Sequence, residues 1–156
     1  GAGFDWLLFD TEHTPADVET VLGQLQAAAA YPVHPAVRVA WNDHVLIKRF
    51  LDIGAQTLLL PYVQNAQEAS AAVSAMRYGP NGVRGMGGTM RATRFGRVAD
   101  YVKNVEQELC LLVQVETSVF YRILEPEKTV YRIRDVDAAI ATTVAGIVRS
   151  EIGMTW

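Results

Sequence analysis

Short apolar stretches alternate along the chain with longer segments whose apolar residues recur every three or four positions. The apolar stretches predict four strands, at residues 4–10 (FDWLLFD), 35–40 (PAVRVA), 56–63 (QTLLLPYV) and 109–116 (LCLLVQVE). The periodic segments predict four helices, at residues 14–30, 41–55, 65–79 and 98–108. Strands alternating with helices indicate an α/β fold of parallel βα units, which forms either a barrel or a doubly wound sheet.

Capping signals suggest where the first two helices begin and end. Thr14 is the expected N-cap of the first helix, with Pro15 at its first position and Asp17 completing a box-like pattern. Asp43 is the expected cap of the second helix, and Gly54 is expected to end it.

Polar side chains at the strand ends help to choose between the two folds. All but one lie at carboxyl ends of predicted strands, and Arg38 interrupts the second strand; the set is Asp10, Glu12, His13, Arg38, Gln114 and Glu116. Active sites of parallel α/β folds occupy this edge. No GxGxxG follows the first strand and no P-loop is present, while the glycine-rich segment 78–88 lies in the wrong context. The pattern therefore favours a barrel over a nucleotide-binding sheet.

Composition narrows the possible partners. The 156 residues suffice for one domain, and a net charge of −3 argues against a nucleic-acid binder. Cys110, the single cysteine, excludes an internal disulfide and fits a reducing, cytoplasmic location; we expect it in the core. We expect no membrane segment and no signal peptide, and we expect the arginines other than Arg38 at the surface.

Several motifs in order resemble one known family, the HpcH/HpaI metal-dependent pyruvate aldolases. They are GFDWLLFDTEHTPADVETVLGQLQAAAAYP, VRVAWND, DIGAQTLLLPYVQNAQEA, RYGPNGVRGMGG and LLVQVE, and the resemblance covers about residues 1–117. It implies a partial TIM barrel and reversible cleavage of 4-hydroxy-2-oxo acids to pyruvate and an aldehyde. It also implies a divalent cofactor (Mg, Mn or Co) and a homo-oligomer.

The resemblance also implies roles for individual residues. His13 would be the catalytic base, acting with or through metal-bound water, and Asp10 would be the acid that orients its imidazole. Arg38 would hold the pyruvate carbonyl oxygen. Glu116 would be one of two metal carboxylates, and Gln114 would lie near metal-bound water or substrate.

Each of these residues also has a purely structural interpretation. Asp10 could cap the following turn, His13 could be a surface histidine, Arg38 a structural ion-pair residue and Glu116 an ordinary strand-end acid. Glu12 is expected to act only through its charge at the following helix N-terminus.

The tail at 118–156 departs from the family pattern. Its segments FYRIL and TVYRI predict strands, and residues 135–153 predict a helix. The tail resembles part of an SPFH (stomatin/prohibitin-like) domain, a class of membrane-associated scaffold, without the anchor. The family's second metal carboxylate is not found, and Asp135 and Asp137 lie in a helix-like context. The alternative hypothesis is therefore a non-catalytic fragment or chimera that acts as an oligomerising or interaction module.

Overall fold

The computed structural model describes residues 2–116 of the 156-residue chain. The strands and helix expected at 118–156, the resemblance of that tail to an SPFH domain, and Asp135 and Asp137 lie outside the described residues.

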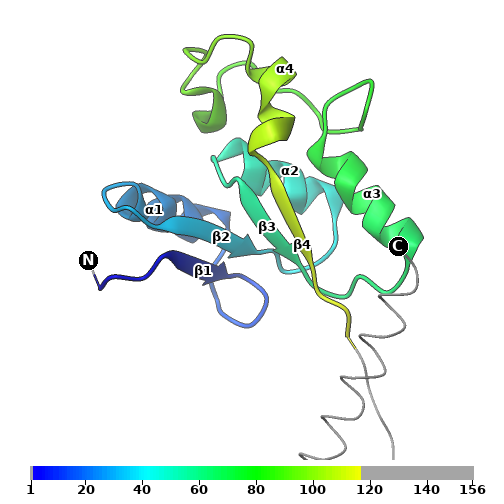
Figure 1. The fold of residues 1–156 in the computed structure, drawn as a ribbon, viewed down its shortest axis with the longest axis horizontal. Coiled ribbons are helices and arrows are strands. Elements are labelled where there is room, and N and C mark those ends of the chain that lie inside the picture. The colour runs from blue at the N-terminus through cyan, green and yellow to red at the C-terminus, as the bar shows by residue number, and fades with distance from the viewer. Residues whose placement is uncertain (1, 117–156) are drawn as a thin grey trace, which may run out of the picture. The chain divides into compact units, whose positions relative to one another are not determined.

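A parallel sheet of four strands organises the described residues (Figure 1). The strands are β1 (Trp6–Asp10), β2 (His34–Arg38), β3 (Thr57–Leu60) and β4 (Cys110–Val113). Their spatial order is β1-β2-β3-β4, and every neighbouring pair is parallel. A doubly wound sheet reverses direction at a switch point, whereas a barrel adds each new strand on the same side. The sequential order thus confirms the expected partial barrel.

Three helices connect these strands and build one core with them. They are α1 (Val18–Ala28), α2 (His44–Asp52) and α3 (Ala66–Met76). The core takes side chains from the helix-facing side of β2 and β3, from the residue just past the end of β2, and from α2, α1 and α3. These are Val37, Leu58, Leu60, Val39, Ile47, Phe50, Leu51, Val21, Leu25, Ala72 and Met76. Burying such large apolar side chains is worth roughly 1.5–3 kcal/mol each.

The first helix begins later than the sequence predicts. Asp17, not Thr14, is the N-cap of α1, and its Oδ1 accepts the Thr20 backbone N–H at 2.9 Å. The Thr14 hydroxyl instead donates to the Asp10 carbonyl, which ties it to the end of β1. The expected cap of α2 is confirmed, since Asp43 accepts the N–H groups of the residues two and three positions on.

The fourth predicted helix is mostly absent. Residues 98–108 contain only α4 (Tyr101–Asn104) and a 3₁₀ turn (Val105–Glu108). Asp100 has a positive φ of 52°, and a left-handed residue cannot continue a helix. A further 3₁₀ turn (Arg91–Thr93) lies in the preceding loop.

One face of the sheet is open among residues 2–116. Pairing aligns Leu8, Ala36, Thr57 and Cys110 in one row and Asp10, Arg38, Leu59 and Leu112 in the next, all on the same face. On the outer strands Leu8 is 38% exposed and Leu112 46% exposed, whereas Ala36 and Thr57 on the central strands are buried. Cys110 is exposed too, so its predicted place in the core is wrong. The core forms on the opposite face, against the helices, and this face is the one that a closed barrel would turn inward.

The glycine-rich segment has a packing role at the end of α3. A Cβ on Gly82 would lie 2.3 Å from the backbone oxygens of Ser74 and Arg77, so only glycine fits. Arg84 in the same segment is fully buried, against the expectation of a surface position. It donates to Asp52 at 2.9 Å, and its guanidinium carbon lies 4.6 Å from the centre of the Tyr78 ring.

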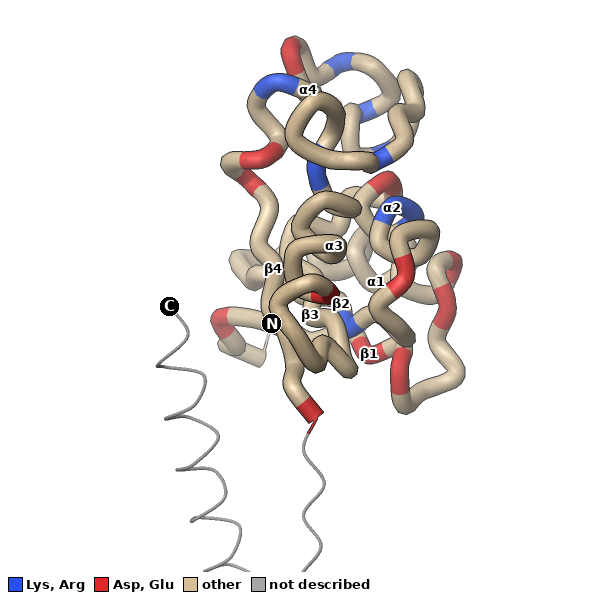
Figure 2. The backbone as a smooth tube through the Cα atoms, turned by 90° about the vertical axis from the view of Figure 1, so that its right-hand side faces the viewer, with Lys and Arg blue, Asp and Glu red and all other residues tan. Residues whose placement is uncertain are grey.

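The charged positions are spread over the molecule, but acidic positions cluster near the end of β1, beside the basic position on β2 (Figure 2). Within residues 2–116, no helix has the length and apolar character to span a bilayer.

Candidate active site

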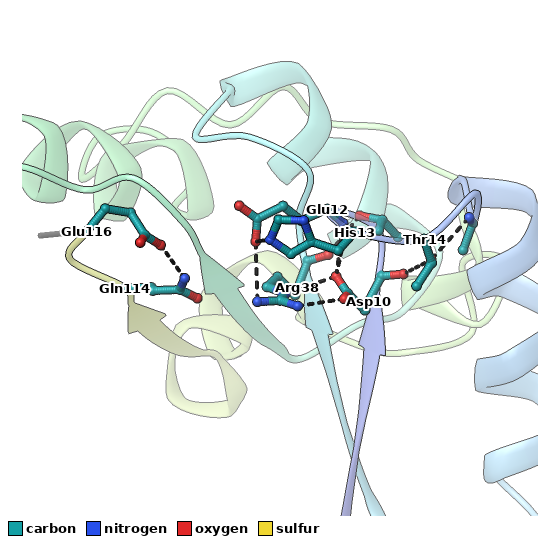
Figure 3. Close-up of polar contacts among 9 residues, drawn as sticks. Asp10, Glu12, His13, Thr14, Arg38, Gln114 and Glu116 are labelled. Atoms are coloured by element: carbon teal, nitrogen blue, oxygen red, sulfur yellow. Dashed lines mark hydrogen bonds and ion pairs between the residues drawn. The ribbon is translucent and has the colours of Figure 1, made fainter. Parts of the chain in front are cut away.

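Arg38 and Asp10 form the centre of a polar cluster at the carboxyl ends of β1 and β2 (Figure 3). The two residues are direct neighbours in the strand register, so their side chains share the open face of the sheet. Arg38 Nε donates to Asp10 Oδ1 at 2.9 Å and Nη2 donates to Oδ2 at 2.5 Å. This two-pronged contact fixes the plane of the guanidinium.

Glu12 and His13 complete the cluster from the loop that follows β1. Glu12 Oε2 lies 3.3 Å from Arg38 Nη1 and 3.5 Å from His13 Nε2. Asp10 Oδ1 accepts the backbone N–H of Glu12 at 3.0 Å and that of His13 at 3.4 Å. Asp10 therefore holds the loop that carries the imidazole, while the carboxylate nearest the ring is that of Glu12.

The contacts shift the pKa values of Asp10 and Arg38 in opposite directions. The hydrogen bonds from Arg38 lower the pKa of Asp10 to about 2, with the backbone N–H groups of the loop acting in the same direction and burial opposing. The hydrogen bond to Asp10 raises the pKa of Arg38, and the charges of Glu12 and Glu116 add to the effect. Both groups of the pair are therefore charged at neutral pH.

Arg38 remains able to bind a substrate oxygen. A guanidinium carries more N–H donors than the contacts with Asp10 and Glu12 use. A donor fixed in place by two carboxylates is suited to stabilise negative charge that develops on a carbonyl oxygen. The exposed ring of His13, whose side chain is 68% accessible, can take up or release a proton beside it.

Gln114 and Glu116 form a second group at the end of β4, on the same edge of the sheet (Figure 3). The Gln114 side-chain amide donates to Glu116 Oε1. The Gln114 backbone N–H donates to the Leu60 carbonyl of β3, and its carbonyl accepts the N–H of Val63. The negative charge of Glu116 adds to the raised pKa of Arg38, so this carboxylate lies within electrostatic range of the guanidinium.

The metal donors within residues 2–116 are incomplete. The Glu116 carboxylate and the Gln114 amide oxygen are hard donors of the kind that Mg²⁺ and Mn²⁺ bind. No group of three His, Cys, Asp or Glu side chains in the described part of the chain is arranged to hold a metal ion. These residues therefore fit part of the ligand set of a divalent cation.

The sequence analysis missed one member of this cluster. Glu12 was expected to act at a helix N-terminus, but α1 begins at Val18 and the Glu12 side chain turns to Arg38 instead. The position of Glu12 in the loop directly after β1 was the available signal, because loops at the carboxyl ends of parallel strands carry the site residues.

Comparison with known proteins identifies the family. The model of the HpcH/HpaI aldolase/citrate lyase family matches residues 1–120. A pyruvate aldolase of Rhizobium etli is 65% identical over 129 residues, covering 83% of this chain and 51% of the relative. A 4-hydroxy-2-oxo-heptane-1,7-dioate aldolase of Shigella sonnei is 54% identical over 138 residues, covering 88% and 50%.

A solved structure agrees with these sequence matches. An HpcH/HpaI aldolase/citrate lyase family protein from Burkholderia cenocepacia superposes with a TM-score of 0.71 at 41% identity, over 75% of this chain and 48% of that protein. The described residues thus form part of an α/β-barrel of the aldolase type. The chain belongs to the HpcH/HpaI aldolase/citrate lyase family, and it spans about half the length of the curated relatives it matches.

Proposed function

We propose that the site performs divalent-metal-dependent aldol chemistry, cleaving 4-hydroxy-2-oxo acids to pyruvate and an aldehyde. The observation that carries the proposal is the convergence of His13, Arg38 and two carboxylates at the carboxyl edge of a barrel sheet. The names of the relatives, a pyruvate aldolase and 4-hydroxy-2-oxo-heptane-1,7-dioate aldolases, support the same substrate class.

The chain's own residues account for the proton and the charge in this reaction. His13 accepts the proton of the 4-hydroxyl, so that C4 becomes the aldehyde carbonyl as the C3–C4 bond breaks. The bonding electrons pass to the C2 oxygen, giving the enolate of pyruvate, and Arg38 donates N–H groups to that oxygen. The protonated His13 then gives this proton to C3, which yields pyruvate and restores the neutral base. A divalent cation with Glu116 and Gln114 among its ligands would supply further positive charge for the same oxygen.

The test is exchange of the pyruvate methyl protons in deuterated water, which requires only the enolate half of the reaction. The folded 156-residue chain is incubated with pyruvate and Mn²⁺, the metal is chelated, and exchange is read by NMR. We expect exchange above the metal-only blank, its loss without metal, and its loss in His13→Ala and Glu116→Ala. His44→Ala is the matched control, because His44 is an exposed histidine at the start of α2.

A non-catalytic role is the second candidate. It is favoured by the incomplete set of metal donors within residues 2–116 and by the open face of the sheet. Under this alternative the chain is a fragment or chimera that associates with other chains. Absence of exchange from folded protein, with the blank and the variants indistinguishable, would support it over the aldolase proposal.

A further inference from the structure

The Glu12 carboxylate lies between the guanidinium of Arg38 and the imidazole of His13 (Figure 3). Its side chain is only 11% exposed, less than that of Asp10 or Arg38. The Oε2 atom, which faces both neighbours, is buried and has no hydrogen-bond partner in the described part of the chain. A buried carboxylate oxygen left in this state is costly unless nearby positive charge or a donated proton compensates it.

Two ordinary structural roles do not account for Glu12. It caps no helix, since α1 has Asp17 as its N-cap and begins at Val18. It is not needed to neutralise Arg38, because Asp10 already meets that guanidinium through two hydrogen bonds. With Asp10 already paired to Arg38, the Glu12 carboxylate leaves the cluster with a net negative charge. A second positive charge next to Glu12 would balance it, and His13 is the group that can supply this charge.

We propose that Glu12 is a positioning residue for the His13 base. Its Oε2, 3.5 Å from Nε2, is placed to receive the Nε2–H of the imidazole, which would leave Nδ1 with the lone pair that takes the substrate proton. When that proton arrives, the Glu12 carboxylate offsets the charge of the imidazolium. Because Glu12 also contacts Arg38 Nη1, the same carboxylate positions both the imidazole and the guanidinium. This role rests on the proposed aldol function, and it assigns the orienting contact to Glu12 where the sequence resemblance had assigned it to Asp10.

The first test reads the state of the His13 ring without any activity. At alkaline pH, where histidine rings are neutral, the ¹⁵N shifts of the two ring nitrogens report how strongly one tautomer is preferred. The chain has three histidines, and His13→Ala assigns the signal. We expect a larger separation of the two shifts for His13 than for the exposed His44. Glu12→Gln, which keeps the side-chain shape, should reduce that separation to the His44 value.

Two further variants serve as a control and as a graded change for this measurement. Glu19→Gln removes an exposed glutamate from the first turn of α1 and should leave the His13 shifts unchanged. Glu12→Asp keeps the charge but shortens the side chain, and it should give an intermediate separation. Equal separations for His13 and His44 in the unaltered chain, or no change in Glu12→Gln, would overturn the proposal.

The second test separates this inference from the proposed function. In the pyruvate exchange assay, Glu12→Gln should lower kcat about tenfold and leave KM for pyruvate within about twofold, because Arg38 still binds the substrate oxygen. Normal kcat in Glu12→Gln would overturn the positioning role and leave the aldolase proposal intact. If neither the unaltered chain nor any variant exchanges protons, the aldolase proposal fails. If the His13 shifts still depend on Glu12 in that case, the positioning contact stands.

Discussion

Two acids and one arginine set the electrostatics at the scale of single residues. Asp10 and Glu12 contact different nitrogens of the Arg38 guanidinium, and the three side chains are each no more than 20% exposed. Asp10 and Arg38 therefore interact more strongly than an ion pair at the surface, although nearby water still screens their charges. The effect of this pair on stability should be visible as a dependence on pH.

The sign of that dependence follows from the pKa of Asp10. Folding lowers this pKa from 3.8 to about 2, so the stabilisation is fully present above the unfolded value and is lost as pH falls towards 2. Allowing for screening, we expect a contribution of about 1 kcal/mol. Urea unfolding at stepped pH values should show this loss in the unaltered chain and a flatter profile in Asp10→Asn. An identical slope in the two proteins would contradict the assignment, and Glu19→Gln serves as the control.

At the scale of elements, local capping determines where α2 begins and ends. Asp43 accepts two backbone N–H groups at 2.9 Å, and Gly54, with a φ of 97°, supplies the left-handed residue just past the helix end. This helix contributes Ile47, Phe50 and Leu51 to the core and follows directly on the strand that carries Arg38. Its stability therefore supports the site indirectly.

Removing this cap should destabilise the fold measurably. We expect Asp43→Ala to lower the free energy of unfolding by about 1 kcal/mol, since two N–H groups lose their acceptor. Asp43→Asn should retain most of the stability, because an asparagine oxygen also caps well. Thermal or urea unfolding followed by circular dichroism measures both. Equal losses in the two variants would show that the carboxylate acts through its charge instead.

At the scale of the whole sheet, the face opposite the helices carries exposed apolar side chains. Leu8 and Leu112 are exposed there on the two outer strands, together with Cys110. Exposed apolar side chains on a sheet face of this kind favour association. The homo-oligomer implied by the family resemblance, like the cytoplasmic location, stays a prediction.

The single cysteine provides a direct probe of this face. If copies of the chain associate through it, the rate at which Cys110 reacts with a thiol reagent should fall as protein concentration rises. Sedimentation velocity over the same range should show larger species. A chain with Leu8→Lys and Leu112→Lys should react rapidly at every concentration. Labelling that does not depend on concentration would argue against association through this face.

The sequence by itself determined most of the strands and helices and the edge of the sheet at which the polar side chains gather. Apolar periodicity, the cap at Asp43 and the polar residues after the strands depend on neighbours along the chain, and the structure contains the βα order that they predict. The family resemblance, carried by motifs in order, is likewise confirmed. The roles of His13, Asp10, Arg38, Gln114 and Glu116 stay predictions.

Only the tertiary structure decided which groups meet. Asp10 and Arg38 are 28 positions apart, and the strand register brings them together. The same geometry turned Glu12 towards Arg38 and His13, and it left Cys110 on the open face instead of in the core. Residues 98–108 carry a helical pattern, yet left-handed backbone at Asp100 confines the α-helix there to a single turn. Local pattern fixes periodicity and capping, whereas contacts between distant strands depend on register and on what covers each face of the sheet.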